Sequence, residues 1–259
     1  MARASKTTES KKGGGIRWRV WARAAIGAVV FVSTAMAALK ARQYALTDPQ
    51  FRLLKDKPDS LVISGLRYAS RARVQRVFAA DFGRSVFGVP IEERRRRLLA
   101  IDWVEDASVL RVWPDRLSVE IHERKPVAFV FFRSGVLLID AHGVLLDVPQ
   151  LARFPFPVLS GVREDETEPQ RQERVRVLLR VQEDMGYLAK DISELNAADP
   201  DNVRIIARVD HRALELILGD GNFARRYQNF LSHYPEIFRH SPAVRTFDLR
   251  LDDRITAKE

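Results

Sequence analysis

Residues 103–123 read WVEDASVLRVWPDRLSVEIHE, and they carry the clearest secondary-structure signal in the chain. Residues 104–113 are rich in β-branched and apolar side chains and lead into Pro114-Asp115, a dipeptide typical of turns. Residues 117–123 then alternate strictly between apolar and polar side chains, which is the period of a strand with one buried face. The stretch therefore predicts two strands joined by a tight turn.

The residues before this strand pair predict one more strand and two helices. A short strand at 61–63 is ended by Ser64-Gly65, and a helix from Arg71 to about Phe82 follows Ser70, an N-cap residue type. A second helix is expected from Pro90 or Ile91 to Leu99, because proline suits the first turn of a helix. The order strand, helix, helix, strand, strand predicts two helices covering one face of a three-stranded sheet.

After Lys125-Pro126 the sequence pattern changes to short apolar runs separated by turn residues. They predict a region that is mostly sheet with two helices, and the fold class of the whole is therefore α+β. The expected strands are 128–132, 136–139, 144–146, 203–209, 213–218 and 244–251. The expected helices are 170–185 and 222–238. An extended connector is expected at 154–157, and a final short stretch at 254–257.

An uncharged apolar segment near the N-terminus predicts a membrane span. Residues 24–39 read AAIGAVVFVSTAMAAL, and the flanks extend the segment to residues 24–42. Residues 1–23 form a basic tail with seven basic side chains and one acid, so the positive-inside rule places the N-terminus in the cytoplasm and residues 45–259 outside it. Residues 43–58 are expected to be a linker. The alternative is a signal peptide cleaved after Ala35-Met36-Ala37, which leaves the folded part on the same side.

Composition and charge exclude several functional classes. The tail contributes +6 of the net charge of +9, so the folded region lacks the basic excess of a nucleic-acid-binding domain. The chain has no cysteine, which excludes disulfides and thiolate chemistry. We find no metal-binding, cofactor-binding or catalytic motif, and we expect no small-molecule substrate. The run Arg94–Arg97 follows Glu92 and Glu93 and is interpreted as a solvated helix face, with binding of anionic lipid or of a partner as the alternative.

Two motifs carry a resemblance to a known family. Residues 103–117 resemble the signature W-V-x-x-A-x-V-x-R-x-x-P-x-x-L of the POTRA domain, and residues 123–128 are similar to its exit, E-R-x-P-V-A. Together with the basic tail and one span, the chain resembles the FtsQ/DivIB family of bacterial cell-division proteins. The resemblance implies a POTRA domain at 59–126 and a β domain at 127–259.

The resemblance also implies a function and a partner surface. Members of the family are non-enzymatic scaffolds of the division complex, located in the inner membrane at the septum, with their bulk in the periplasm. Their C-terminal sheet edge binds a strand of FtsB in a complex with FtsL, so FtsB-like and FtsL-like partners are expected here. The candidate partner-binding residues lie around the stretch FDLRL, which resembles the family's v-D-L-R-y strand: Phe247, Leu249, Arg250, Leu251, Asp252, Asp253, Arg254 and Ile255.

Two alternatives belong to other functional classes. One is a membrane-anchored envelope enzyme whose site has no recognisable motif. The other is a POTRA-containing outer-membrane assembly factor, although a barrel of that class needs more residues than follow the single POTRA-like unit.

Overall fold

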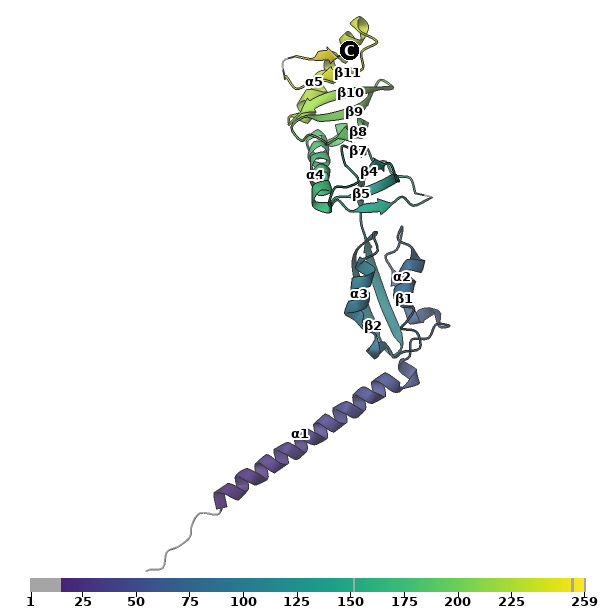
Figure 1. Ribbon diagram of the computed structural model, residues 1–259, viewed down its shortest axis with the longest axis vertical. Coiled ribbons are helices and arrows are strands. Elements are labelled where there is room, and N and C mark those ends of the chain that lie inside the picture. The colour runs from purple at the N-terminus through teal and green to yellow at the C-terminus, as the bar shows by residue number, and fades with distance from the viewer. Residues whose placement is uncertain (1–14, 151, 253, 259) are drawn as a thin grey trace, which may run out of the picture. The chain divides into compact units, whose positions relative to one another are not determined.

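The structure is a computed structural model that describes residues 15–150, 152–252 and 254–258 (Figure 1). Its contacts divide the chain into two compact units. Unit 1 takes in the described residues up to Ile63 together with Phe78–Arg94 and Val109–Val119. Unit 2 contains Ser64–Val77, Arg95–Ser108 and the described residues from Glu120 onward. Helices and strands are both present throughout the folded part, and the α+β class expected from the sequence is confirmed.

The first helix, α1 (Gly15–Thr47), contains the predicted span. Its stretch Trp21–Thr47 is long and apolar enough to cross a membrane and is not buried against the rest of the structure. The helix ends at Asp48-Pro49, where the Asp48 carboxylate accepts a hydrogen bond from the Gln50 N–H (2.9 Å) and begins the 3-10 turn η1 (Pro49–Phe51). Proline cannot continue the hydrogen-bonding of the preceding helix, so the chain turns here into the folded region.

The predicted order of strand, helix, helix, strand, strand is present. The elements are η2 (Pro58–Ser60), β1 (Leu61–Ser64), α2 (Arg71–Val77), η3 (Val86–Gly88), α3 (Ile91–Leu99), β2 (Val104–Val112) and β3 (Arg116–Glu123). The three strands form one sheet in the order β1-β3-β2. Leu117, Val119 and Ile121 of β3 are buried, as the alternation predicted. Helix α2 ends at Val77, five residues earlier than expected, and the chain continues in tight turns to Gly83.

The expectation of a solvated arginine run is wrong at Arg94. This side chain is 4% exposed and binds the fully buried Asp81 through Nε (2.6 Å) and a second nitrogen (2.8 Å). A bidentate guanidinium–carboxylate pair satisfies both buried charges. Asp81 lies in the turns that follow α2, where its carboxylate meets this partner. Arg95 is also engaged, since its Nε donates to the Ala107 carbonyl (2.8 Å).

The C-terminal region is a nine-stranded sheet in the order β12-β11-β10-β9-β8-β7-β4-β5-β6. Helices α4 (Glu168–Met185) and α5 (Phe223–His240) pack on it and share one core with its strands. A short 3-10 segment, η4 (Gly186–Asp191), follows α4. The strands are β4 (Pro126–Phe132), β5 (Gly135–Asp140), β6 (Leu145–Asp147), β7 (Val158–Ser160), β8 (Ile192–Asn196), β9 (Val203–Val209), β10 (Arg212–Gly219), β11 (Thr246–Asp248) and β12 (Thr256–Lys258).

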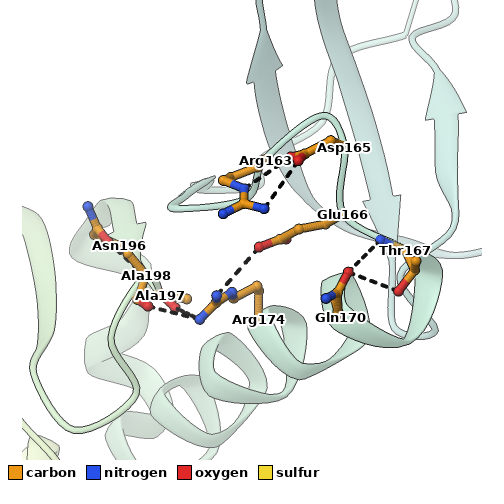
Figure 2. Close-up of polar contacts among 9 residues, drawn as sticks. All are labelled: Arg163, Asp165, Glu166, Thr167, Gln170, Arg174, Asn196, Ala197 and Ala198. Carbon is orange, nitrogen blue, oxygen red and sulfur yellow. Dashed lines mark hydrogen bonds and ion pairs between the residues drawn. The ribbon is translucent and has the colours of Figure 1, made fainter.

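A polar network joins the loop before α4 to the loop after β8. Figure 2 shows the Arg174 side chain pointing to the Glu166 carboxylate (3.4 Å) and to the carbonyls of Ala197 and Ala198 (3.0 and 2.9 Å). The Glu166 side chain is 5% exposed, and its second carboxylate oxygen has no hydrogen-bond partner. Arg174 is therefore the charge partner on which this buried carboxylate depends.

Replacing Arg174 should destabilise the C-terminal region because it leaves Glu166 buried and uncompensated. We expect Arg174→Met to lower the free energy of unfolding by about 3 kcal/mol, measured by urea denaturation. Arg176→Met is the matched control on the same helix, since Arg176 is exposed, and it should change stability by less than about 0.5 kcal/mol. The double variant Glu166→Met with Arg174→Met should recover most of the loss. Equal effects of the two single arginine variants would contradict the assignment.

Candidate functional site: the C-terminal edge of the large sheet

Strand β12 is the outermost strand of the nine-stranded sheet. It pairs antiparallel with β11, with Thr246 opposite Lys258, Phe247 opposite Ala257 and Asp248 opposite Thr256. All three of its residues are exposed, and in the described part of the chain no further strand pairs with its outer side. An edge strand of this kind presents unpaired peptide groups that a strand from another chain can bind.

The hydrogen bonds of β11 show which peptide groups of β12 face outward. The Glu215 N–H donates to the Arg245 carbonyl (2.9 Å), and the Leu249 N–H donates to the Ile217 carbonyl (2.9 Å), so residues 245 and 249 both face β10. Peptide groups alternate sides along a strand, so Phe247 also faces β10, while Thr246 and Asp248 face β12. Ala257 lies opposite Phe247, and its N–H and C=O therefore point away from the sheet.

Side chains cover two other exposed strands. At the opposite end of the sheet, the Trp103 indole N–H donates to the Asp147 carbonyl of β6 (3.1 Å). On β2, the Arg95 guanidinium occupies the Ala107 carbonyl, and the Asp106 carboxylate accepts the Ala107 N–H (2.8 Å). Peptide groups occupied in this way are poor templates for strand addition. The outer side of β12 has no such cover among the described residues.

Ionic contacts hold the connection between β11 and β12. The Asp248 carboxylate accepts from the Arg250 guanidinium (2.7 and 2.9 Å) and is approached by the Lys258 ammonium (3.2 Å). The hydrogen bonds from Arg250 lower the pKa of Asp248 well below its usual range, with a smaller contribution from Lys258. These contacts fix the position of Arg250, where the connection begins. They also hold the side chain of Lys258, the one charged residue of β12, against β11.

A groove runs between α5 and this connection. One cavity of about 350 Å³ and another of about 530 Å³ share Asn229, Asp252 and Ile255 in their walls. The Arg226 guanidinium organises the groove by donating to the Asp252 carboxylate (2.9 Å) and to the Leu218 carbonyl (2.6 Å). Its hydrogen bond lowers the pKa of Asp252. The groove ends next to the first residue of β12 and has mixed polar and apolar walls.

The residues that the sequence pointed to fall into two groups. Phe247 and Leu249 are 1% and 2% exposed and belong to the core, so their side chains anchor the edge from inside. The second group lies in the connection and around the groove, and consists of Arg250, Leu251, Asp252, Arg254 and Ile255. Asp253 lies outside the described residues. The edge strand itself begins after them, at Thr256, and sequence reasoning did not assign a partner role to Ala257.

No cluster of three or more histidine and acidic side chains able to hold a metal ion occurs in residues 15–150, 152–252 and 254–258. The two cavities beside α5 contain charged groups, but the carboxylate of Asp252 and the guanidinium of Arg226 are bound to each other. The chemistry that this arrangement offers is backbone hydrogen bonding along β12, flanked by a groove for side chains.

The Asp248 contacts should make the stability of the edge depend on pH. A carboxylate whose pKa is lowered by folding stabilises the folded state above its unfolded pKa of about 4, and this contribution is lost as the pH falls. We expect Asp248→Asn to flatten the acid side of the curve of thermal midpoint against pH. Asp165→Asn is the control, because Asp165 also pairs with an arginine two residues away, but solvent screens this exposed pair, so the acid side of the curve should stay nearly unchanged. Parallel curves for wild type and Asp248→Asn would contradict the prediction.

Comparison with known proteins gives consistent matches over most of the chain. Residues 57–124 match the family described as "POTRA domain, FtsQ-type", and residues 128–250 match "Cell division protein FtsQ/DivIB, C-terminal". The chain is similar to the cell division protein FtsQ of Koribacter versatilis, with 34% identity over 89% of this chain and 67% of the relative. It is also similar to FtsQ of Actinobacillus pleuropneumoniae, with 28% identity over 58% of this chain and 62% of the relative.

A solved structure is similar in sequence over a shorter stretch. It is the major extracytoplasmic domain of the trans isomer of the cell division protein DivIB from Geobacillus stearothermophilus. The alignment has 22% identity, covers 45% of this chain and 92% of that chain, and has a TM-score of 0.26. The family matches and the 34% identical relative carry the assignment. The FtsQ/DivIB proteins are cell-division proteins and not a known enzyme family, and this chain belongs to the FtsQ/DivIB family.

Proposed function

We propose that this chain is a non-enzymatic scaffold of the bacterial division complex that captures another membrane division protein by strand addition to β12. The observation that carries the proposal is the outward direction of the Ala257 peptide groups on an uncovered, exposed edge strand. A partner strand that bonds to these groups would extend the sheet by one strand. Main-chain hydrogen bonds would supply affinity, and side chains in the neighbouring groove would supply selectivity.

The partners that suit this role are an FtsB-like protein together with an FtsL-like protein, each anchored by a single span. Ala257 lies opposite Phe247, which packs against Phe230 of α5 (5.1 Å between ring centroids), so both residues are on the sheet face that α5 covers. A partner residue on this face would lie beside Ile255 and should be apolar. The basic side chains of Arg225 and Arg254 line the groove and favour acidic residues in the flanking partner segment.

The membrane arrangement forms the second part of the proposal. The apolar stretch of α1 crosses the inner membrane once, the basic tail stays in the cytoplasm, and the folded region lies in the periplasm at the division septum. We place the POTRA domain at residues 59–126 and the β domain at 127–259. In this arrangement the edge of β12 is presented on the side of the membrane where the extracytoplasmic parts of single-pass partners lie.

Proline at Ala257 tests the proposal without removing a hydrogen bond inside the sheet. The proline ring replaces the outward N–H and blocks the approach of a second strand, while the inward bonds of Thr256 and Lys258 remain. We expect Ala257→Pro in the full chain to weaken capture of the FtsB-like partner by at least tenfold, about 1.4 kcal/mol, in a pull-down from detergent or nanodiscs.

Ala257→Val is the matched control, because valine keeps the N–H and favours a strand. It should retain the partner, and both variants should keep the thermal midpoint of the wild type. Capture by Ala257→Pro at the wild-type level would refute strand addition at β12. Loss of capture by both variants would point to the side-chain surface instead of the peptide edge.

A further inference from the structure

An aromatic cluster within unit 1 surrounds the C-terminal end of α1. Phe51 makes edge-to-face contacts with Tyr44 of α1 (5.8 Å between centroids), with Phe87 of η3 (5.3 Å) and with Trp113 in the turn after β2 (5.2 Å). Phe51 is 3% exposed, whereas Trp113 is 69% exposed. Trp113 therefore packs on a buried aromatic residue but leaves most of its own side chain exposed. Such an exposed aromatic side chain indicates that it is covered by something outside this chain.

Hydrogen bonds fix this cluster to the end of the helix. The buried Ser85 hydroxyl donates to the Ala45 carbonyl in the last turns of α1 (2.6 Å). The Gln50 side chain donates to the Tyr44 hydroxyl (2.7 Å). The Leu53 N–H donates to the Arg84 carbonyl (2.9 Å), which ties the segment after the helix to the chain around η3. The position of Trp113 is therefore tied to that of Tyr44.

The length of the helix gives the depth of Tyr44 when α1 crosses a bilayer. Trp21 and Tyr44 are both exposed, and Tyr44 follows Trp21 by 23 positions, which correspond to about 35 Å of helix. The hydrocarbon core is about 30 Å thick, and aromatic residues of amphipathic character prefer its two boundaries. With Trp21 at one boundary, Tyr44 lies at the other. Trp113 is connected to Tyr44 through Phe51, which contacts both rings.

Basic side chains lie around the same end of α1, beside Leu46 and Thr47 of this helix. A cavity of about 500 Å³ is lined by Arg52, Arg84 and Leu46, together with Thr47, Gly83, Ser85 and Gly88. Arg52 and Arg84 are exposed, and Arg52 also donates to the Thr47 carbonyl (3.4 Å). Two acids of the same unit are paired with other cations, since Asp115 pairs with Lys57 (2.6 Å) and Asp81 pairs with Arg94. Two exposed guanidinium groups beside a leucine side chain complement a phosphate with an attached acyl chain.

We propose that this juxtamembrane face, formed by Trp113, Leu46, Arg52 and Arg84, rests in the headgroup layer of the membrane that α1 crosses. Trp113 lies at the boundary of the acyl chains, and the two arginines bind phosphates of anionic phospholipids. The occupant is the lipid surface itself, because it is the partner that the end of a spanning helix always meets. The inference rests on the proposed membrane span and adds to it a bilayer-binding surface on the folded region.

Single-cysteine labelling can test the contact, because the natural chain contains no cysteine. A nitroxide on Gly88→Cys reports from the rim of the cavity, where a Cβ atom meets only ordinary contact with Leu46. The full chain is placed in nanodiscs that contain phosphatidylglycerol, and accessibility to oxygen and to a water-soluble nickel reagent is measured. We expect the Gly88 label to show headgroup depth and a label on Tyr187→Cys, an exposed residue of η4, to be aqueous.

The contact should require both parts of the face. Arg52→Gln combined with Arg84→Gln should weaken surface binding by about 30-fold, since each basic residue near an anionic surface contributes about fivefold. Trp113→Ala should likewise shift the Gly88 label to an aqueous environment, and zwitterionic nanodiscs should reproduce the effect of removing the arginines. A label on Val29→Cys in α1 checks the span separately.

An aqueous Gly88 label in anionic nanodiscs, with the Val29 label in hydrocarbon, would overturn this inference and leave the proposed span intact. An aqueous Val29 label would contradict the span itself. A lipid-exposed Gly88 label that is insensitive to Trp113→Ala and to removal of the arginines would show proximity without a binding surface and would also overturn the inference.

Discussion

The alternation of peptide directions along β11 is the constraint on which the proposed partner surface depends. Residues 245, 247 and 249 use their peptide groups toward β10, so β12 can bond only to Thr246 and Asp248. The register cannot slip by one residue, because Phe247 would then leave the core and a polar side chain would enter it. The burial of Phe247 thus determines which peptide groups of β11 face β12, and the pairing of Phe247 with Ala257 then directs the peptide groups of Ala257 away from the sheet.

The contacts around this edge hold it in place, and among the described residues none covers its outer side. Asp248 holds Arg250 and Lys258, and Asp252 is held by Arg226, so the connection between β11 and β12 is fixed by charge pairs. The far end of the sheet and the edge of β2 are occupied by Trp103 and Arg95. Natural sheets blunt their exposed edges against unwanted pairing. β12 is short and carries Lys258, but in the described part of the chain no side chain occupies the outward peptide groups of Ala257, and the proposed strand addition uses these groups.

Much of the fold could be predicted because its signals are local. The alternation of Leu117, Val119 and Ile121 identified β3, and the turn residues at 114–115 placed β2 before it. Strands β7 and β8 escaped prediction because they are short, and three and five residues are too few for a periodic pattern to stand out. The partner of Arg94 could not be inferred either, since the bidentate contact with Asp81 depends on how the intervening turns fold back.

The sequence predicted the candidate site less accurately than it predicted the fold. The resemblance directed attention to residues 247–255, and that segment does border the sheet edge and the groove. Sequence alone does not say that Phe247 and Leu249 are core residues or that pairing begins at Thr256, because both facts depend on the parallel pairing of β11 with the distant β10. The role of Ala257 follows only from hydrogen-bond directions, and an alanine carries no side-chain signal for it.

Hydrogen exchange of single amides tests the direction of these peptide groups most directly. In the free protein, the Ala257 amide should exchange with solvent faster than the amides of Thr256 and Lys258, which face β11, and it should become protected when the FtsB-like partner binds. An Ala257 amide that is already protected in the free protein, or that stays unprotected in the complex, would contradict the account.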